Sequence, residues 1–225
     1  MLEPKVKLNR LEKSICAFEE ETIKEGLILF YGDSAFTRWS GKYGMPSLTD
    51  EIRKKDGSIA VVNHGFGGST AEEQLYYYQR AVKPWKPKAL VLLTFGNDHD
   101  CNYTPEEILA LQSRIVEYAK IDFPEIRIFI CSHRPYPLFD APVLGMGPRS
   151  AVKQYNELLS LYCSLHPEIT LVDVYNDPRF YTSPENTGNL KEVREELYIE
   201  DRVHFNEKGY AIFKEIFMNA LSDLL

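Results

Sequence analysis

A short apolar run is followed directly by small polar residues in the stretch Leu27-Ile28-Leu29-Phe30-Tyr31-Gly32-Asp33-Ser34. A run of this length without polar alternation is typical of a strand that is buried on both faces of a parallel sheet. Four further runs of the same kind follow along the chain, at residues 59–62, 89–95, 126–131 and 169–174. The sequence therefore predicts five parallel strands.

Helical patterns occupy the intervals between these runs. Apolar residues recur at helical spacing over 70–82, 106–120, 151–165 and 207–224, and a polar helix-like segment covers 8–24. Alternating strands and helices indicate βαβ units, whose right-handed crossovers place helices on both faces of a doubly wound sheet. No linker divides the chain, so we expect a single α/β domain over 1–225, with an N-terminal helical extension over 1–26 and a core over 27–225.

Composition excludes several classes of protein. The chain has 225 residues and is 44% hydrophobic, which is too apolar for a disordered protein. Its longest apolar runs, such as 89–93, are far shorter than the roughly 20 residues that a membrane span needs. The net charge of -7 offers no basic stripe to nucleic acid, so neither nucleic acid nor a membrane is an expected partner. The four cysteines are widely separated, which favours reduced thiols, and the absence of a secretory pattern favours a cytoplasmic location.

Small polar clusters end the first three strands. They are Gly32-Asp33-Ser34, the segment 63–70 and Gly96-Asn97-Asp98. Because the carboxyl ends of parallel strands meet at one edge of the sheet, we expect these clusters to lie together where ligands bind in such folds. A fourth cluster, Asp201-Arg202-Val203-His204, stands just before the last helix.

These clusters hold the groups that acyl transfer needs. Ser34 follows a glycine at a strand–helix turn and can expose its hydroxyl as a nucleophile. His204 is the candidate base, and Asp201 lies three residues before it, so one short loop can supply both the base and the group that orients it. The Gly68 backbone N–H and the Asn97 side-chain N–H could stabilise the negative charge that develops on the attacked carbonyl oxygen.

Together the four clusters resemble the sequence blocks of the SGNH (GDSL) hydrolase family, in particular its subgroup of small bacterial GDSL-like lipases and acylhydrolases. The similarity extends to Phe30-Tyr31-Gly32-Asp33-Ser34 with Arg38 and Trp39, to Asn63-x-Gly65-Phe66-Gly67-Gly68-Ser69-Thr70 and to Asp201-x-Val203-His204-Phe205-Asn206-x-x-Gly209-Tyr210. The order and spacing of the blocks also match, over about residues 27–221.

This resemblance implies a flavodoxin-like sheet in the strand order 2-1-3-4-5, with the strand before Ser34 lying between those before Gly68 and Asn97. It implies that Ser34 is the nucleophile and that its own N–H is a third oxyanion donor. It assigns His204 as general base and then acid, and Asp201 as the residue that orients the imidazole. It further implies a serine esterase or acylhydrolase that forms an acyl-enzyme with a small ester and needs no cofactor and no metal.

One position departs from the family pattern. The family has a glycine two residues before the oxyanion asparagine, whereas Phe95 stands two residues before Asn97 and the only glycine is the adjacent Gly96. We therefore expect either a different local backbone or a substrate pocket that Phe95 narrows.

Six side chains beside the motifs are candidates for the substrate pocket: Phe36, Trp39, His64, Phe66, Phe95 and His133. Phe36, Trp39 and Phe66 would form an apolar rim that weakly favours a short acyl chain, whereas the histidines could instead serve only the loops that hold them. The long loops 41–57, 134–149 and 176–200 should cover the same edge and shape the acyl and leaving-group pockets. The natural substrate and the oligomeric state stay open.

Two other functions compete with the esterase. The segment Gly96-Asn97-Asp98-His99-Asp100 loosely resembles a block of the metal-dependent phosphoesterases, with Asp33 and His204 as candidate ligands, but the other blocks of that class are absent. A non-catalytic module that binds a glycan or an acyl group on the same fold is the second alternative. Activity in the presence of a chelator and labelling of Ser34 by a serine-reactive probe would separate the three.

Overall fold

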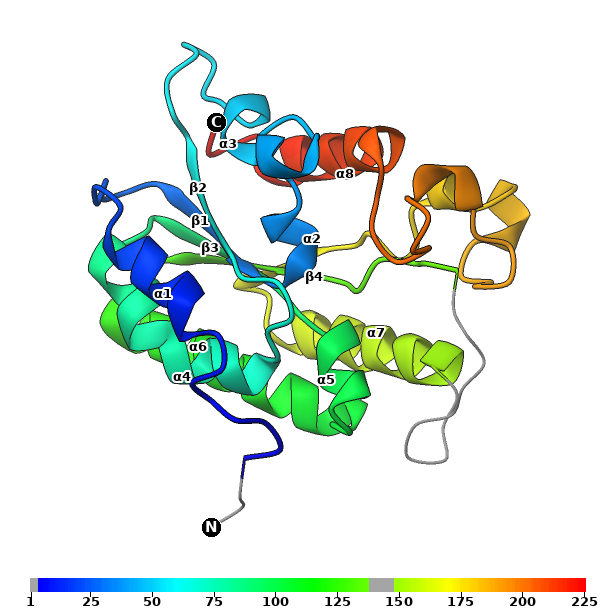
Figure 1. The fold of residues 1–225 in the computed structure, drawn as a ribbon, viewed down its shortest axis with the longest axis horizontal. Helices are drawn as coiled ribbons and strands as arrows, with labels where there is room; N and C mark the ends of the chain where they lie inside the picture. The colour runs from blue at the N-terminus through cyan, green and yellow to red at the C-terminus, as the bar shows by residue number, and fades with distance from the viewer. Residues whose placement is uncertain (1–3, 138–147) are drawn as a thin grey trace.

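The centre of the computed structural model, which describes residues 4–137 and 148–225, is an all-parallel sheet between two layers of helices (Figure 1). Its strands are β1 (Ile28–Gly32), β2 (Val61–Gly65), β3 (Ala89–Leu93), β4 (Arg127–Cys131) and β5 (Ile169–Val172). They lie in the order β2-β1-β3-β4-β5, which confirms the predicted fold class. The strands β1 and β3 are buried along their whole length, because helices cover both faces of the sheet.

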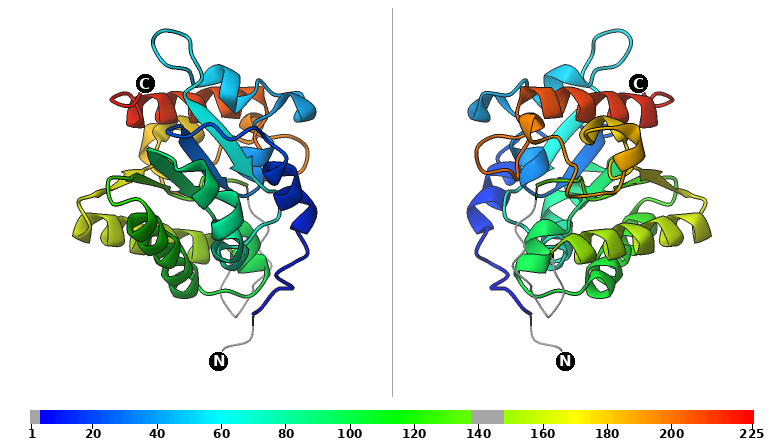
Figure 2. Two further views of the ribbon diagram at one scale, coloured as in Figure 1. Left: turned by 90° about the vertical axis from the view of Figure 1, so that its left-hand side faces the viewer. Right: turned by 90° about the vertical axis from the view of Figure 1, so that its right-hand side faces the viewer.

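The helices of the two layers come from the segments between the strands and, for the last helix, from the segment after β5 (Figure 2). One face is covered by α4 (Ala71–Ala81), α6 (Pro105–Asp122) and α7 (Pro148–Leu165), and the other by α2 (Ser34–Thr37), α3 (Leu48–Glu51) and α8 (Glu207–Ala220). The first helix, α1 (Glu12–Glu19), packs against α4, and α5 (Gly96–Asp100) follows β3 directly. Every predicted helix is present, but the first is much shorter than 8–24 and α8 ends before 224.

The helix starts are fixed by local hydrogen bonds. Thr70 and Glu73 form a reciprocal capping box at the start of α4, and Thr104 and Glu107 do the same for α6. Each box satisfies two backbone N–H groups that the first helical turn leaves without partners. The beginning of α4 is therefore well defined, which matters because it follows the loop that carries Gly68.

The expected long loops contain short helical turns. The segment 41–57 holds a 3₁₀ turn over Gly41–Tyr43 together with α3, and the segment 176–200 holds three more. These three are Pro178–Phe180, Pro184–Asn186 and Glu195–Leu197. Most of the loop expected over 134–149 lies outside the described residues.

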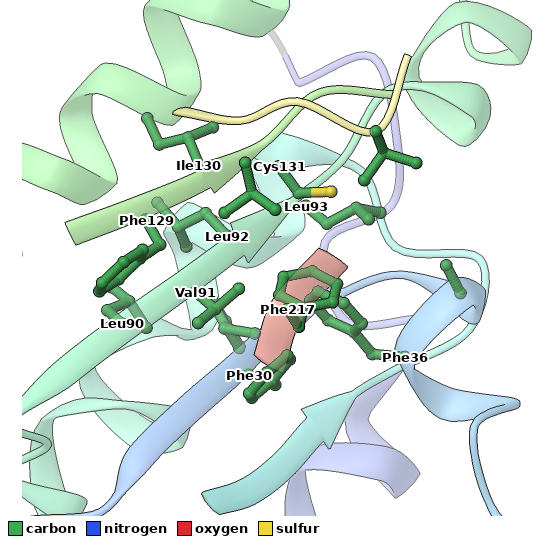
Figure 3. Packing of buried hydrophobic residues seen from close by; sticks show 14 of the residues in the cluster. Phe30, Phe36, Leu90, Val91, Leu92, Leu93, Phe129, Ile130, Cys131 and Phe217 are labelled. Carbon is green, nitrogen blue, oxygen red and sulfur yellow. The ribbon is translucent and has the colours of Figure 1, made fainter. Parts of the chain in front are cut away.

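An aromatic cluster joins β1 to α2 and α8 (Figure 3). The ring of Phe30 lies 5.1 Å from both Phe36 and Phe217, centre to centre, and all three side chains are fully buried. Burying such large apolar side chains is the main source of stability in a domain of this kind. The cluster therefore holds the turn after β1 firmly against the core.

In residues 4–137 and 148–225, no helix is both long and apolar enough to cross a membrane. All four cysteines are free, as expected from their spacing. The cytoplasmic location stays a prediction.

Candidate active site

The turn after β1 presents Ser34 at the carboxyl edge of the sheet. Asp33 directly follows β1 and caps α2 by accepting a hydrogen bond from the Ala35 N–H at 2.8 Å, so Ser34 is the first residue of the helix. The turn fits closely between its neighbours: a Cβ on Gly65 would lie 2.4 Å from the Thr37 nitrogen. The glycine at the end of β2 therefore allows the backbone of α2 to pack closely against the sheet.

A continuous hydrogen-bond chain runs from Ser34 to His204 and Asp201. The Nε2 atom of His204 lies 2.8 Å from the Ser34 Oγ, and its Nδ1 atom lies 2.6 Å from the Asp201 Oδ2. A carboxylate can only accept hydrogen bonds, so Nδ1 carries the proton and Nε2 is free to accept the proton of the serine hydroxyl. The geometry is that of a serine nucleophile, a general base and an orienting acid.

The loop that carries His204 is held by hydrogen bonds to the Asp201 side chain and by one distant arginine. The Asp201 Oδ1 accepts hydrogen bonds from the backbone N–H groups of Val203 and His204, each at 2.9 Å. A buried arginine at the end of β4, Arg134, donates to the Val203 carbonyl at 2.9 Å. From α8, the Tyr210 hydroxyl donates to the Ala35 carbonyl at 2.9 Å, which links this helix directly to the Ser34 turn.

Electrostatics keep the base neutral and the acid charged at neutral pH. Burial and the nearby Arg134 charge lower the pKa of His204 below its ordinary value, although the bond to Asp201 opposes them. Burial alone would raise the pKa of Asp201, but the hydrogen bonds from His204 and Val203 outweigh it and lower the pKa to about 2. A neutral imidazole beside a charged carboxylate is the combination that can accept the proton of a hydroxyl group.

Two further groups face Ser34 from the neighbouring strands. Gly68 follows β2 with a φ of +82°, a conformation that favours glycine. The Asn97 Nδ2, which follows β3, donates one hydrogen to the Ser69 carbonyl at 3.0 Å and keeps a second one available. The buried Asp98 ties these two segments together, because its Oδ1 accepts from the Ala71 N–H at 2.6 Å. Burial raises the pKa of Asp98 to about 7.

These residues surround a small depression that we call the serine hollow, with a volume of about 280 Å³. Its lining residues are Ser34, Thr37, Arg38, Tyr43, Gly67, Gly68, Asn97 and His204. The structure thus brings together the Ser34, Gly68, Asn97 and His204 that the sequence singled out, with Asp201 directly behind His204. This volume is at the lower end of those of ligand-binding pockets.

Sequence reasoning missed Arg10, which supports this site from the N-terminal extension. Its Nη2 atom donates to the Gly68 carbonyl at 2.5 Å and to the Glu73 Oε2 at 2.7 Å. The Glu73 carboxylate is completely buried, so the arginine links the glycine loop to the capping box of α4. No periodicity or motif marks Arg10 in the sequence, since the contact joins residues 58 positions apart.

Phe95 occupies a backbone conformation that suits the glycine it replaces. Its φ is +144°, in the region that side chains rarely adopt, which costs of order 1–3 kcal/mol. Its buried ring packs on Tyr155 at 4.8 Å and lies parallel to His99 at 5.9 Å, centre to centre. Of the two outcomes expected for this position, the unusual backbone is observed, whereas the ring turns into the core and does not narrow the serine hollow.

None of the six expected pocket side chains lines the serine hollow; all are buried: Phe36, Trp39, His64, Phe66, Phe95 and His133. The expected apolar rim is instead part of the core: α8 covers Phe36 and Trp39, whereas Phe66 packs on Phe18 and Tyr77 on the other side of the sheet. The His64 ring stacks on Phe18 at 4.2 Å, and its Nδ1 lies 2.7 Å from the Ala81 carbonyl. Burial lowers the pKa of His133 to about 3, so it stays neutral.

Trp39 borders a second depression, which we call the adjoining hollow, of about 400 Å³. It shares Thr37 and Tyr43 with the serine hollow. Across the described ranges, no three His, Cys, Asp or Glu side chains are grouped so that they could hold a metal ion. In particular, His99 is buried against Phe95.

A doubly wound sheet with a Ser–His–Asp hydrogen-bond chain at its carboxyl edge defines the class of α/β proteins with a hydrolase-type serine site. The chain belongs to the GDSL-like lipase/acylhydrolase family, whose family model matches residues 30–212. Membership of this family supports a hydrolase function. No curated protein matches the chain in sequence.

Solved structures share the fold at low sequence identity. A GDSL-like lipase from Bacteroides thetaiotaomicron is 17% identical, with a TM-score of 0.73 over 97% of this chain and 100% of that one. A lipase/acylhydrolase from Enterococcus faecalis is 18% identical, with a TM-score of 0.70 over 88% and 96%. The esterase EstA from Pseudoalteromonas, solved in a form inhibited by monoethylphosphonate, is 14% identical with a TM-score of 0.61 over 88% and 98%.

Proposed function

We propose that this protein is a serine-dependent ester hydrolase that works through an acyl-enzyme on a small ester. The observation that carries the proposal is the chain from the Ser34 Oγ through His204 to Asp201, with distances of 2.8 and 2.6 Å. Both distances lie within hydrogen-bond reach, which is what proton transfer between a nucleophile and its base requires.

In the first half of the reaction, the Ser34 Oγ attacks the ester carbonyl while the His204 Nε2 takes the hydroxyl proton. The carbonyl oxygen becomes negative and accepts hydrogen bonds from the N–H groups of Ser34 and Gly68 and from the Asn97 Nδ2. His204 then gives its proton to the oxygen of the leaving alcohol, and the C–O bond breaks. The acyl group stays on Ser34.

In the second half, His204 takes a proton from a water molecule, which attacks the acyl-enzyme. The tetrahedral intermediate uses the same three donors, and its collapse returns the proton to Ser34 and releases the carboxylic acid. Asp201 stays ionised throughout, because its pKa of about 2 lies far below neutral pH. Every step uses only side chains and backbone groups that line or adjoin the serine hollow.

The size of the serine hollow favours a short acyl chain. A volume of about 280 Å³ suits an acetyl or similarly small group together with part of the alcohol. The lining residues are mostly polar or glycine, so a long alkyl chain would find little apolar surface there.

A chain-length series of p-nitrophenyl esters, from acetate to decanoate, tests the function, with acetylated sugars added as a second substrate class. We expect the highest kcat/KM for the shortest chains, and a loss of at least ~10⁴-fold in Ser34→Ala. The control is Ser113→Ala, which removes an exposed hydroxyl on α6 that bonds only to the Ala110 carbonyl. Wild-type activity in Ser34→Ala would refute the proposal.

A further inference from the structure

Arg38 stands on the same face of the helical turn as the candidate nucleophile. It follows Ser34 by four residues, and its backbone N–H donates to the Ser34 carbonyl at 2.9 Å. Residues three and four apart on a helix project to the same side, so Ser34, Thr37 and Arg38 all face the serine hollow. A fixed positive charge therefore borders the place where an ester would react.

Arg38 differs from most other arginines of the described segments in having no carboxylate partner. Eight arginines in the described segments form ion pairs with carboxylates: Arg10, Arg53, Arg80, Arg114, Arg127, Arg179, Arg194 and Arg202. Within those same segments, Arg38 has no carboxylate at such a distance, and its guanidinium lies over the Tyr43 ring at 5.1 Å. Its planar set of N–H donors is thus available to a ligand.

A second cation extends this positive region. The Lys42 Nζ lies 5.8 Å from the centre of the same Tyr43 ring, and Lys42 lines the adjoining hollow. Arg38 borders the serine hollow, so both cations lie over the ring of Tyr43, a residue that lines both hollows. This concentration of positive charge is unusual in a chain whose net charge is -7.

In the described segments no carboxylate forms an ion pair with Arg38 or Lys42, although Glu21, which lines the adjoining hollow together with Lys42, makes no hydrogen bond to the His64 Nε2, which lies 3.8 Å away. Asp201 is bonded to His204, and Glu51 accepts from the Trp39 indole at 2.6 Å and pairs with Lys214 at 3.1 Å. None of these carboxylates neutralises Arg38.

We propose that Arg38, supported by Lys42 and Tyr43, forms an anion subsite, so that the substrate is an ester that also carries a carboxylate or a phosphate group. The inference rests on the proposed ester hydrolase function and assigns its substrate class. An arginine fork binds a carboxylate through two parallel hydrogen bonds, which fixes the ligand as well as attracting it. Arg38 is thus a specificity residue, separate from the oxyanion donors Gly68 and Asn97.

Matched esters test the subsite. We would compare p-nitrophenyl hydrogen succinate with p-nitrophenyl methyl succinate, in which a methyl ester replaces the carboxylate, with p-nitrophenol release as the readout, and 2-acetoxyethyl phosphate with 2-acetoxyethanol as the phosphate arm. The wild type should prefer the anionic member of at least one pair. In Arg38→Gln we expect kcat/KM for that anionic ester to fall by about 10- to 100-fold, chiefly through KM, with little change for its neutral partner.

Two variants sharpen this comparison. Arg38→Lys keeps the charge but not the fork, and should recover only part of the preference. Arg114→Gln removes an equal charge on the exposed surface of α6, where Arg114 pairs with Glu117, and should leave the preference unchanged. The subsite is refuted if the wild type prefers neither anionic ester, or if Arg38→Gln slows both members of a pair equally.

A binding measurement separates this inference from the proposed function. Succinate and dimethyl succinate would be titrated into Ser34→Ala and into Ser34→Ala with Arg38→Gln, with binding followed by NMR. Binding of succinate that depends on Arg38 supports the subsite even if no ester is hydrolysed, and equal binding by the two proteins overturns it. Hydrolysis that survives in Ser34→Ala overturns the proposed function while leaving this result intact.

Discussion

The proposed nucleophile and its proposed base come from two regions that are built in different ways. Ser34 follows a fully buried strand and sits in a turn that the aromatic core holds in place. His204 belongs to a segment without any strand of the sheet, and its partner Asp201 has a side chain that is 38% exposed. Packing thus fixes the part of the site around Ser34, which we call the strand half, and individual hydrogen bonds fix the part around His204 and Asp201, which we call the loop half. Apart from Ser34 itself, substitutions in the strand half should mainly lower stability, whereas those in the loop half should mainly lower activity.

The largest loss of activity is expected from a substitution in the loop half, at Asp201. Asp201→Asn keeps an oxygen that can accept from the Val203 and His204 N–H groups, but its amide cannot accept from the His204 Nδ1. The imidazole then carries its proton on Nε2 and cannot accept the proton of the Ser34 hydroxyl. We expect kcat for ester hydrolysis to fall by ~10⁴-fold with little change in thermal stability. Asp50→Asn, on the exposed surface, is the matched control. A loss of less than tenfold would show that the loop does not depend on this hydrogen bond.

Substitutions in the strand half should lower the free energy of unfolding. Phe95, which directly precedes α5, offers the most specific test. Phe95→Ala and Phe95→Gly both lose the buried ring, at a cost of about 3–5 kcal/mol. Only glycine also relieves the φ of +144°, so we expect Phe95→Gly to be at least as stable as Phe95→Ala. This reverses the usual order, in which glycine is the less stable of the two by about 0.5–1 kcal/mol. Urea unfolding of both variants measures the difference, and the usual order would contradict the account of this backbone.

The smallest effect is expected at the His204–Ser34 contact, where the two halves meet, and it concerns the pH dependence of kcat/KM. In the proposed mechanism the base is neutral His204, whose folded-state pKa is lowered, so kcat/KM should rise with pH through a value below 6.5 and be level at pH 7. The Arg38 charge contributes to this lowering, and Arg38→Gln should therefore move the acid limb to higher pH. The pH profile of kcat/KM with a neutral ester checks both statements. An acid limb that shifts to lower pH in Arg38→Gln would contradict them.

The same two halves explain what the sequence could predict. The strand blocks were predictable because apolar runs locate the strands and the carboxyl ends of parallel strands meet at one edge, which places Ser34, Gly68 and Asn97 together. The Asp201–His204 loop has no such periodicity. Its residue types marked a candidate base with an orienting acid, but no pattern placed this loop next to Ser34, and only the family resemblance supported that placement.

Side-chain directions were not predictable from the sequence. Phe36 and Trp39 stand next to the nucleophile along the chain but point into the core, because α8 covers them. The supports from Arg10 and Arg134 depend on contacts between distant segments, for which neither residue carries a local signal.

Labelling with a fluorophosphonate probe tests most directly whether Ser34 is an activated nucleophile. We predict that the probe modifies Ser34 alone at neutral pH, as located by mass spectrometry of the peptides, and that His204→Ala labels far more slowly because the hydroxyl no longer has a base. Failure of the wild-type protein to react, or modification at a different residue, would contradict the central claim.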